Sequence, residues 1–153
     1  MPRTDTASRV LLAPVTAVYS ALVDPEALSA WLPPGDLTGT IEQFDPRPGG
    51  SFRLVLKYPD RSPSQGKTTP DTDVVEARFV DLVPDTRIVF SVDFVSDDHA
   101  YDDTMIMTWE VIPVDGGTRV EFTADNVPGA VLEGDHVAGM ESSLAKLAGY
   151  LAT

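Results

Sequence analysis

Apolar and polar residues alternate with a period of two over most of the segment from residue 38 to residue 124. Met105, Met107 and Trp109, for example, are each separated by one residue of the opposite face. A period of two with one largely polar face is typical of antiparallel strands covered on one side only. The pattern predicts strands at Thr38–Phe44, Ser51–Tyr58, Val74–Leu82, Arg87–Phe94, Met105–Ile112 and Arg119–Ala124.

Helical spacing appears on both sides of this segment. After a short predicted strand at Arg9–Leu12, Ala13-Pro14 starts a short helix, because proline is tolerated in a first helical turn. A second short helix follows Asp24, a good N-cap, and ends at Pro33–Gly35. A long helix is predicted at Leu132–Ala152 from an apolar stripe spaced by three and four residues: Val137, Met140, Leu144, Leu147 and Leu151.

Proline and glycine mark the turns between the predicted strands. The segment Asp45–Phe52 contains Arg-Pro-Gly-Gly and leads directly into a strand. It lacks the glycine patterns of phosphate-binding loops and no helix follows it, so we interpret it as a turn that shapes the fold. Pro84-Asp85 and Asp115–Gly117 predict hairpin turns. Pro59–Asp73, rich in Pro, Ser, Thr, Gly and Lys, is expected to be a long mobile loop.

The order of elements predicts an α+β fold. One strand, two short helices, six strands and one long helix give a curved antiparallel sheet of about seven strands wrapped around the C-terminal helix. A single helix covers such a sheet incompletely, so a cavity is expected between them. The length of 153 residues predicts one domain, spanning residues 1–153.

Composition narrows the classes of partner. The net charge of −13 argues against binding to nucleic acid and to anionic membrane surfaces, and it favours solubility or a basic partner. The chain has no cysteine, which excludes disulfides and thiolate chemistry. The first nine residues contain no apolar run and no stretch is long enough to span a membrane, so a cytoplasmic protein is expected.

Several motifs, taken in order, resemble those of one known family. They are Ala13-Pro14-x-x-x-Val18-Tyr19, Ala21-Leu22-Val23-Asp24-Pro25-Glu26-x-Leu28-x-x-Trp31, Asp45-x-Arg47-Pro48-Gly49-Gly50-x-Phe52, Leu82-Val83-Pro84-x-x-Arg87-Ile88-Val89-Phe90, Gly116-Gly117-Thr118-Arg119-Val120 and His136-x-x-Gly139-Met140-x-x-x-Leu144-x-x-Leu147. From Val10 to Leu151 the chain is similar to the helix-grip (START, Bet v 1-like, SRPBCC) superfamily, in the branch named after the activator of Hsp90 ATPase (AHSA1-like).

The resemblance implies the helix-grip fold and only loosely a function. Relatives include ligand carriers, polyketide cyclase-like enzymes, stress-response proteins and co-chaperones, and the branch shares no catalytic residue that can be carried over. The family usually has tryptophan after the glycine of the last helix, where this chain has Met140. A flexible thioether there predicts a cavity wall of different shape.

The predicted cavity has a set of candidate lining residues. They are Trp31, Phe52, Glu76, Arg78, Phe90, Met105, Met107, Trp109, His136, Met140 and Ser143. Glu76 and Arg78 lie two apart and therefore on one face of their strand, which is either the solvent face or the cavity face. If they point inward, they would orient a ligand.

Two histidines are candidates for further chemistry. His136, at the start of the last helix, either faces solvent or lies at the cavity mouth as a general base. His99 lies in the acidic run Asp97–Asp103, which is interpreted as a solvated loop, because the spacing matches no known cation-binding loop. No GxSxG motif is present, so a serine hydrolase is not expected. No cofactor or metal is predicted.

Three functional hypotheses follow. The favoured one is a protein that binds a hydrophobic small molecule without catalysis. The alternative is a polyketide cyclase or dehydratase-like enzyme that uses His136, Glu76 or Arg78 for acid–base chemistry. The third, implied by the resemblance, is a co-chaperone-like module with a chaperone partner. Exposed strand edges would also permit a homodimer.

Overall fold

The computed structural model describes residues 3–33, 35, 37–57, 72–94, 104–128 and 131–152. In chain order its elements are β1 (Arg3–Leu11), α1 (Val15–Leu22), α2 (Pro25–Trp31), β2 (Thr38–Phe44), β3 (Ser51–Lys57), β4 (Thr72–Val83), β5 (Arg87–Phe94), β6 (Met105–Val114), β7 (Gly117–Val127) and α3 (Glu133–Leu151). Within these residues, no helix is both long enough and apolar enough to cross a membrane.

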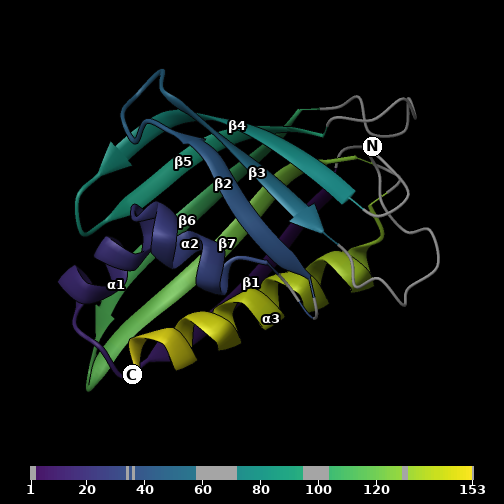
Figure 1. Cartoon of the computed structure of the whole chain (residues 1–153). Helices are drawn as coiled ribbons and strands as arrows, with labels where there is room; N and C mark the ends of the chain where they lie inside the picture. The colour runs from purple at the N-terminus through teal and green to yellow at the C-terminus, as the bar shows by residue number, and fades with distance from the viewer. Residues whose placement is uncertain are drawn as a thin grey trace.

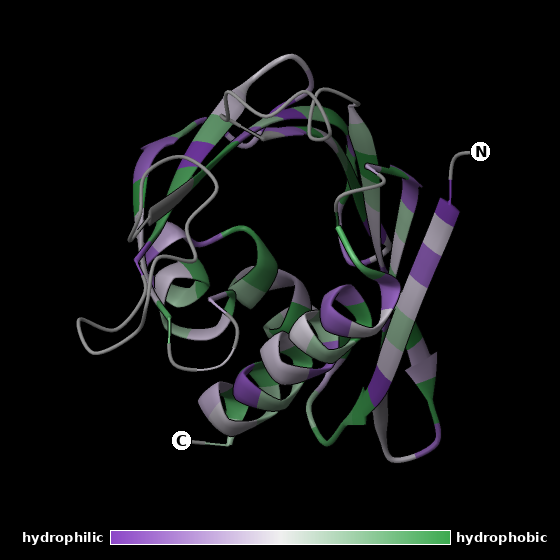
Figure 2. Ribbon diagram, turned by 90° about the vertical axis from the view of Figure 1, so that its right-hand side faces the viewer, coloured by the Kyte–Doolittle hydropathy of each residue, from purple (hydrophilic) through white to green (hydrophobic). Residues whose placement is uncertain are grey.

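The strands form one antiparallel sheet in the order β1-β7-β6-β5-β4-β3-β2. The sheet curves over α3, while α1 and α2 cover the remaining part of the same face (Figure 1). Seen along the axis of the arch, hydrophobic and hydrophilic residues alternate along the strands (Figure 2), and the hydrophobic ones, such as Phe90 and Trp109, are buried. The predicted helix-grip fold is therefore confirmed. The edge strands are β1 and β2, and the homodimer through such edges stays a prediction.

Most element boundaries agree with the alternation in the sequence, but the first strand does not. β2 and β5 have the predicted bounds, whereas β1 begins at Arg3 instead of Arg9. The missed residues are mostly polar, and they are extended because they pair with β7, from Arg3 opposite Val127 to Leu11 opposite Thr118. These residues therefore form a strand because they pair with β7, although their own sequence has no apolar alternation.

A single apolar cluster joins the sheet to the helices. Trp31, at the end of α2, is fully buried, and its ring lies 5.3 Å from that of Trp109 on β6. Its Nε1 donates a hydrogen bond of 2.9 Å to the carbonyl of Ala21 in α1. α2 itself begins as predicted, because the carboxylate of Asp24 accepts a bond of 3.0 Å from the amide of Glu26. The two short helices are thereby fixed to the sheet.

The turn Asp45–Phe52 connects β2 and β3 and also contacts β4. Gly49 donates its amide hydrogen bond to the carbonyl of Phe79, and Phe79 donates back to the carbonyl of Gly50, each at 2.8 Å. A Cβ atom on Gly50 would lie 2.1 Å from the backbone oxygen of Asp45. Only glycine fits there, which supports the interpretation of this segment as a structural turn.

Two sequence predictions fall largely outside the described residues. Residues 59–71 of the predicted loop are not among them, while the last two residues of that loop, Thr72 and Asp73, belong to β4. The acidic run Asp97–Asp103 with His99 also lies outside the described residues.

Candidate functional site

A cavity of about 320 Å³ lies between the concave face of the sheet and α3. Its wall is mainly hydrophobic and comes from β3, β4, β5, β6, β7 and α3. Eight of the residues singled out from the sequence line it: Phe52, Phe90, Met105, Met107, Trp109, His136, Met140 and Ser143. The cavity is therefore the candidate functional site.

Three predicted residues do not line this cavity. Trp31 is packed behind the wall, against Trp109 and Phe122. Glu76 and Arg78 lie on the outer face of β4, because the buried side chains of this strand's inner face belong to Ala77 and Phe79. Of the two faces that the sequence left open for Glu76 and Arg78, the structure has the outer one, so the alternative in which they act as acid–base groups inside the cavity is excluded.

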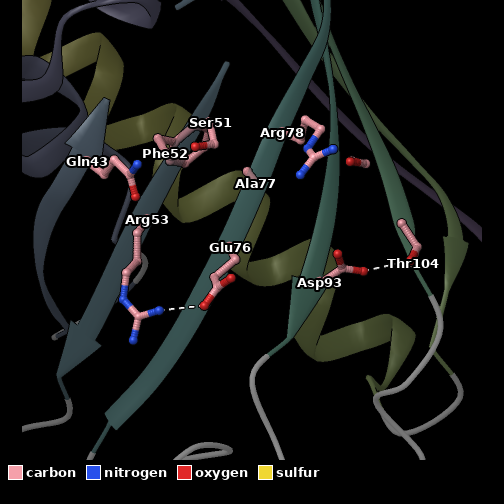
Figure 3. A pocket seen from close by; sticks show the side chains of 10 residues that line it. Gln43, Ser51, Phe52, Arg53, Glu76, Ala77, Arg78, Asp93 and Thr104 are labelled. Carbon is pink, nitrogen blue, oxygen red and sulfur yellow. Dashed lines mark hydrogen bonds and ion pairs between the residues drawn. The ribbon is translucent and has the colours of Figure 1, made fainter. Parts of the chain in front are cut away.

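The outer face carries a second hollow of about 520 Å³, in which Glu76 and Arg78 lie (Figure 3). There the guanidinium of Arg53 bridges Glu42 and Glu76, and Thr104 donates a hydrogen bond of 2.6 Å to Asp93. These groups are exposed to solvent, where ion pairs contribute little to stability. The hollow is a solvated polar surface, and the apolar cavity between the sheet and α3 is the better candidate site for an apolar ligand.

Methionines give the cavity wall an adaptable surface. Met105 and Met107 reach it from β6, and Met140 reaches it from α3. All three are buried. Methionine has three rotatable bonds and a polarisable sulfur, so these side chains can adjust around differently shaped apolar molecules. At Met140 the family's usual tryptophan would occupy part of the same space.

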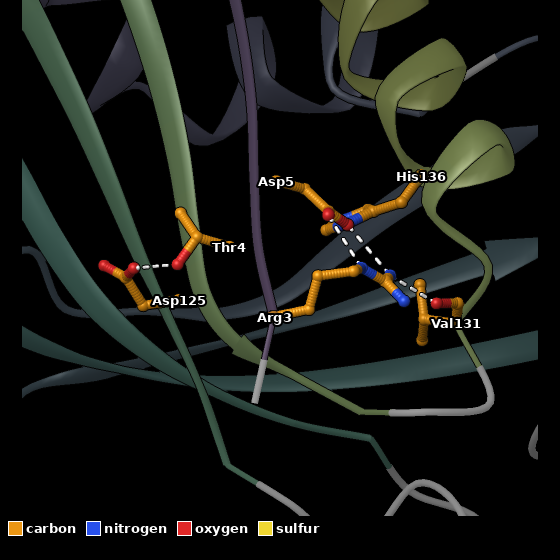
Figure 4. Close-up of polar contacts among 6 residues, drawn as sticks. All are labelled: Arg3, Thr4, Asp5, Asp125, Val131 and His136. Carbon is orange, nitrogen blue, oxygen red and sulfur yellow. Dashed lines mark hydrogen bonds and ion pairs between the residues drawn. The ribbon is translucent and has the colours of Figure 1, made fainter. Parts of the chain in front are cut away.

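The polar end of the cavity is built around a buried carboxylate. Asp5 on β1 is 1% exposed, and its oxygens accept hydrogen bonds from Arg3 Nε at 2.8 Å and Arg3 Nη2 at 2.9 Å. Asp5 Oδ2 also lies 2.7 Å from Nδ1 of His136, in the first turn of α3 (Figure 4). Arg3 bonds in addition to the carbonyl of Val131. This network joins the first strand to the last helix.

The charges in the network fix the orientation of the imidazole. The hydrogen bonds from Arg3 lower the pKa of Asp5, burial opposes this, and the bond from His136 lowers it further. An ionised carboxylate only accepts hydrogen bonds, so we infer that Nδ1 of His136 carries the proton. Nε2 of the neutral ring is then an acceptor, and it has no hydrogen-bond partner among the described residues. His136 lines the cavity, so Nε2 is the ring nitrogen left for a hydrogen bond with a molecule there.

Ser143 lines the cavity but its hydroxyl is occupied. Oγ donates a hydrogen bond of 2.6 Å to the carbonyl of Leu32, at the end of α2. Lys146, one turn further on α3, donates to the carbonyl of Pro33. Both bonds hold α3 against the segment after α2, so Ser143 positions the helix and is not presented as a nucleophile.

The sequence prediction missed Arg3 and Asp5 as site residues. Neither lies in an apolar pattern, and Asp5 is 131 residues away from His136 in the chain. The only local signal was an acidic residue in a polar segment. The alternation of apolar and polar residues cannot distinguish a polar strand of this kind from a loop. Over the described part of the chain, no three His, Asp or Glu side chains are grouped closely enough to hold a metal ion.

Comparison with known proteins finds one family whose model matches this chain and several solved structures that are similar to it. The family model described as Activator of Hsp90 ATPase homolog 1-like protein matches residues 12–152. Protein CV1439 from Chromobacterium violaceum is 29% identical with a TM-score of 0.85, and the match covers 98% of this chain and 97% of that protein. A protein from Rhodobacter sphaeroides is 25% identical with a TM-score of 0.78, and the match covers 97% and 92% of the two chains.

One similar structure has a title that names a biological setting. DynU16, a protein of the dynemicin biosynthetic locus, is 20% identical with a TM-score of 0.71, and the match covers 98% of this chain and 47% of DynU16. At this identity the likeness shows the fold alone. No curated protein matches the sequence.

Proposed function

Because this chain belongs to the Activator of Hsp90 ATPase homolog 1-like family, we propose that it binds a hydrophobic small molecule in the cavity between the sheet and α3. The observation that carries this proposal is an apolar cavity with one oriented imidazole at its polar end. Ligand sites commonly combine such an apolar wall with a few placed polar groups. The wall would supply affinity, and Nε2 of His136 would accept a hydrogen bond from a hydroxyl or amine of the ligand.

The first experiment is a titration with N-phenyl-1-naphthylamine, a neutral apolar molecule whose fluorescence rises in apolar surroundings and which carries one N–H donor. We expect saturable binding at one site per chain. Met140→Trp should weaken binding about tenfold or more, because the larger ring takes space that the probe needs. Arg78→Gln, on the outer face, is the matched control and should bind as the unchanged protein does.

Two results would overturn the proposal. One is the absence of saturable binding by the unchanged protein. The other is equal loss of binding in Met140→Trp and Arg78→Gln, which would locate the probe outside the cavity. Circular dichroism of both variants checks that each remains folded, so that a loss of binding is not a loss of structure.

The pair formed by Asp5 and His136 favours one further candidate, an acid–base enzyme. A carboxylate that orients a histidine so that its other nitrogen is free is a recurring arrangement for a general base. Here the base would remove a proton from a carbon next to a carbonyl, as in cyclisation or loss of water. The fold likeness to DynU16, a protein of a biosynthetic locus, is compatible with such a role.

Mass spectrometry of compounds that co-purify with the protein separates binding from catalysis. A binding protein and its His136→Gln variant should carry the same compound. An enzyme should carry its product, whereas His136→Gln should carry the unreacted substrate, heavier by one water if the reaction is a dehydration. Identical compounds on both proteins would rule out His136 as the base.

A further inference from the structure

The indole nitrogen of Trp109 is an unusual group in this core. Trp109 lies on β6, is 3% exposed and lines the cavity. Its Nε1 is buried without a hydrogen-bond partner, and it is the only side-chain nitrogen or oxygen of the described residues in this condition. A buried donor without a partner has lost its hydrogen bond to water without gaining another, which is destabilising. Native proteins keep few such groups, and each calls for a physical reason.

The other tryptophan shows that this fold can satisfy an indole. Trp31 is equally buried, and its Nε1 donates to the carbonyl of Ala21 at 2.9 Å. Trp109 instead has aromatic neighbours: its ring centroid is 4.9 Å from that of Phe90 and 5.1 Å from that of Phe122. Aromatic rings are weak acceptors. Of the two buried indoles, only that of Trp109 therefore has an N–H group without an oxygen acceptor.

The indole ring that carries this donor is part of the cavity wall. Met107 precedes it by two residues on the same face of β6, and both side chains belong to the cavity wall. The thioether of Met107 can move by rotation about single bonds. A molecule in the cavity can therefore come into contact with the indole without a change in the backbone.

We propose that the natural ligand is an apolar molecule with a carbonyl or other oxygen acceptor, and that this oxygen accepts a hydrogen bond from Nε1 of Trp109. The inference rests on the proposed ligand-binding function and narrows it to a class of ligand. With His136 as the acceptor at the polar end, the cavity offers one donor and one acceptor in an apolar wall. Ring ketones and quinones that also carry a hydroxyl group match this arrangement, whereas saturated hydrocarbon chains do not.

The test compares two probes of nearly the same shape, 9-fluorenone and fluorene, which differ in one carbonyl oxygen. Pairing a buried donor is expected to favour 9-fluorenone by about tenfold, the equivalent of one good hydrogen bond. In Trp109→Phe, which removes the N–H and keeps an aromatic ring, this preference should disappear while fluorene still binds. Affinities can be measured by displacement of N-phenyl-1-naphthylamine.

Nuclear magnetic resonance gives a second readout that needs no variant of the binding residue. The chain has two tryptophans, so a nitrogen–proton correlation spectrum has two indole signals, and Trp31→Phe assigns them. 9-Fluorenone should move the Trp109 indole proton downfield, as a new hydrogen bond does, and should move the Trp31 signal little. Fluorene should not produce the downfield shift.

The outcomes of these measurements are distinct. If neither probe binds, the proposed function itself fails. If both bind with equal affinity, or if the Trp109 signal does not move with 9-fluorenone, the ligand-binding function stands and the acceptor inference is overturned. The Trp109 N–H would then be satisfied by the face of a neighbouring aromatic ring.

Discussion

Replacing Asp5 by Asn tests whether the buried carboxylate holds the first strand, the last helix and the cavity end together. The substitution keeps the shape of the side chain and removes its charge. Asp5 accepts two hydrogen bonds from Arg3 and one from His136. The amide has a single oxygen acceptor, so at least one of these bonds is lost and the rest are no longer assisted by the carboxylate charge.

The magnitude follows from the number and exposure of these bonds. A hydrogen bond to a charged group contributes about 1.5–3 kcal/mol. The Arg3 side chain is 29% exposed, so water replaces part of what it loses and screens the ion pair. We therefore expect Asp5→Asn to lower the free energy of unfolding by about 1–2 kcal/mol at pH 7, well below the 3–5 kcal/mol of a fully buried broken pair.

The effect should depend on pH in one direction. The pKa of Asp5 is lower in the folded chain than its usual value, chiefly because of the hydrogen bonds from Arg3. Its contribution is therefore complete above the unfolded pKa of about 3.9 and is lost as the pH falls through the folded pKa. The stability difference between the two proteins should shrink as the pH falls below about 4.

Urea unfolding followed by circular dichroism at several pH values measures this difference. The matched control is Asp125→Asn on β7, because Asp125 accepts one exposed hydrogen bond of 2.8 Å from Thr4 next to the network. The control should change stability by less than about 0.5 kcal/mol. Equal losses in the two variants, or a loss in Asp5→Asn that is the same at pH 3 and pH 7, would refute the reasoning.

Two further predictions test the local structure, and Gly134→Ala serves as the control for the first. Gly50→Ala should destabilise the protein by about 2–3 kcal/mol, because the new Cβ would meet the Asp45 carbonyl at 2.1 Å, whereas Gly134→Ala, with nothing within 4 Å, should be neutral or stabilising by up to about 1 kcal/mol. Equal urea midpoints for the two alanine variants would contradict this steric argument. Asp24→Ala removes the N-cap of α2 and should cost about 1 kcal/mol in thermal or urea unfolding. No loss would mean that water caps the amide of Glu26 equally well.

Local patterns in the sequence were enough to predict the sheet and its faces. Phe90, Met107 and Trp109 were assigned to the inner face from a period of two, and all are buried there. The face of Glu76 was left open because Val74 and Val75 are both apolar, so β4 shows no clean alternation at its start. Further along β4, Ala77 and Phe79 alternate with polar residues, and this alternation gives the correct inner face. It is a weak signal, because alanine is only slightly apolar.

The polar end of the site could not be predicted in the same way. Asp5 is inside because β1 pairs with β7, and His136 is oriented because α3 packs on β1. Both conditions depend on segments more than 100 residues apart, so neither leaves a mark in the neighbouring sequence. The lack of a hydrogen-bond partner for Nε1 of Trp109 could not be predicted either, because it depends on how the side chains of the core pack around the indole.

The pairing of β1 with β7 has a consequence for the order of events during synthesis. Asp5 is synthesised 131 residues before His136, which at about 5–20 residues per second is a delay of about 7 to 26 seconds. Until β7 has been synthesised, β1 has no partner strand, and until α3 follows, the carboxylate of Asp5 lacks its bond to His136. The cavity is therefore completed only after α3 has been synthesised, and a nascent chain cannot hold a ligand in it before then.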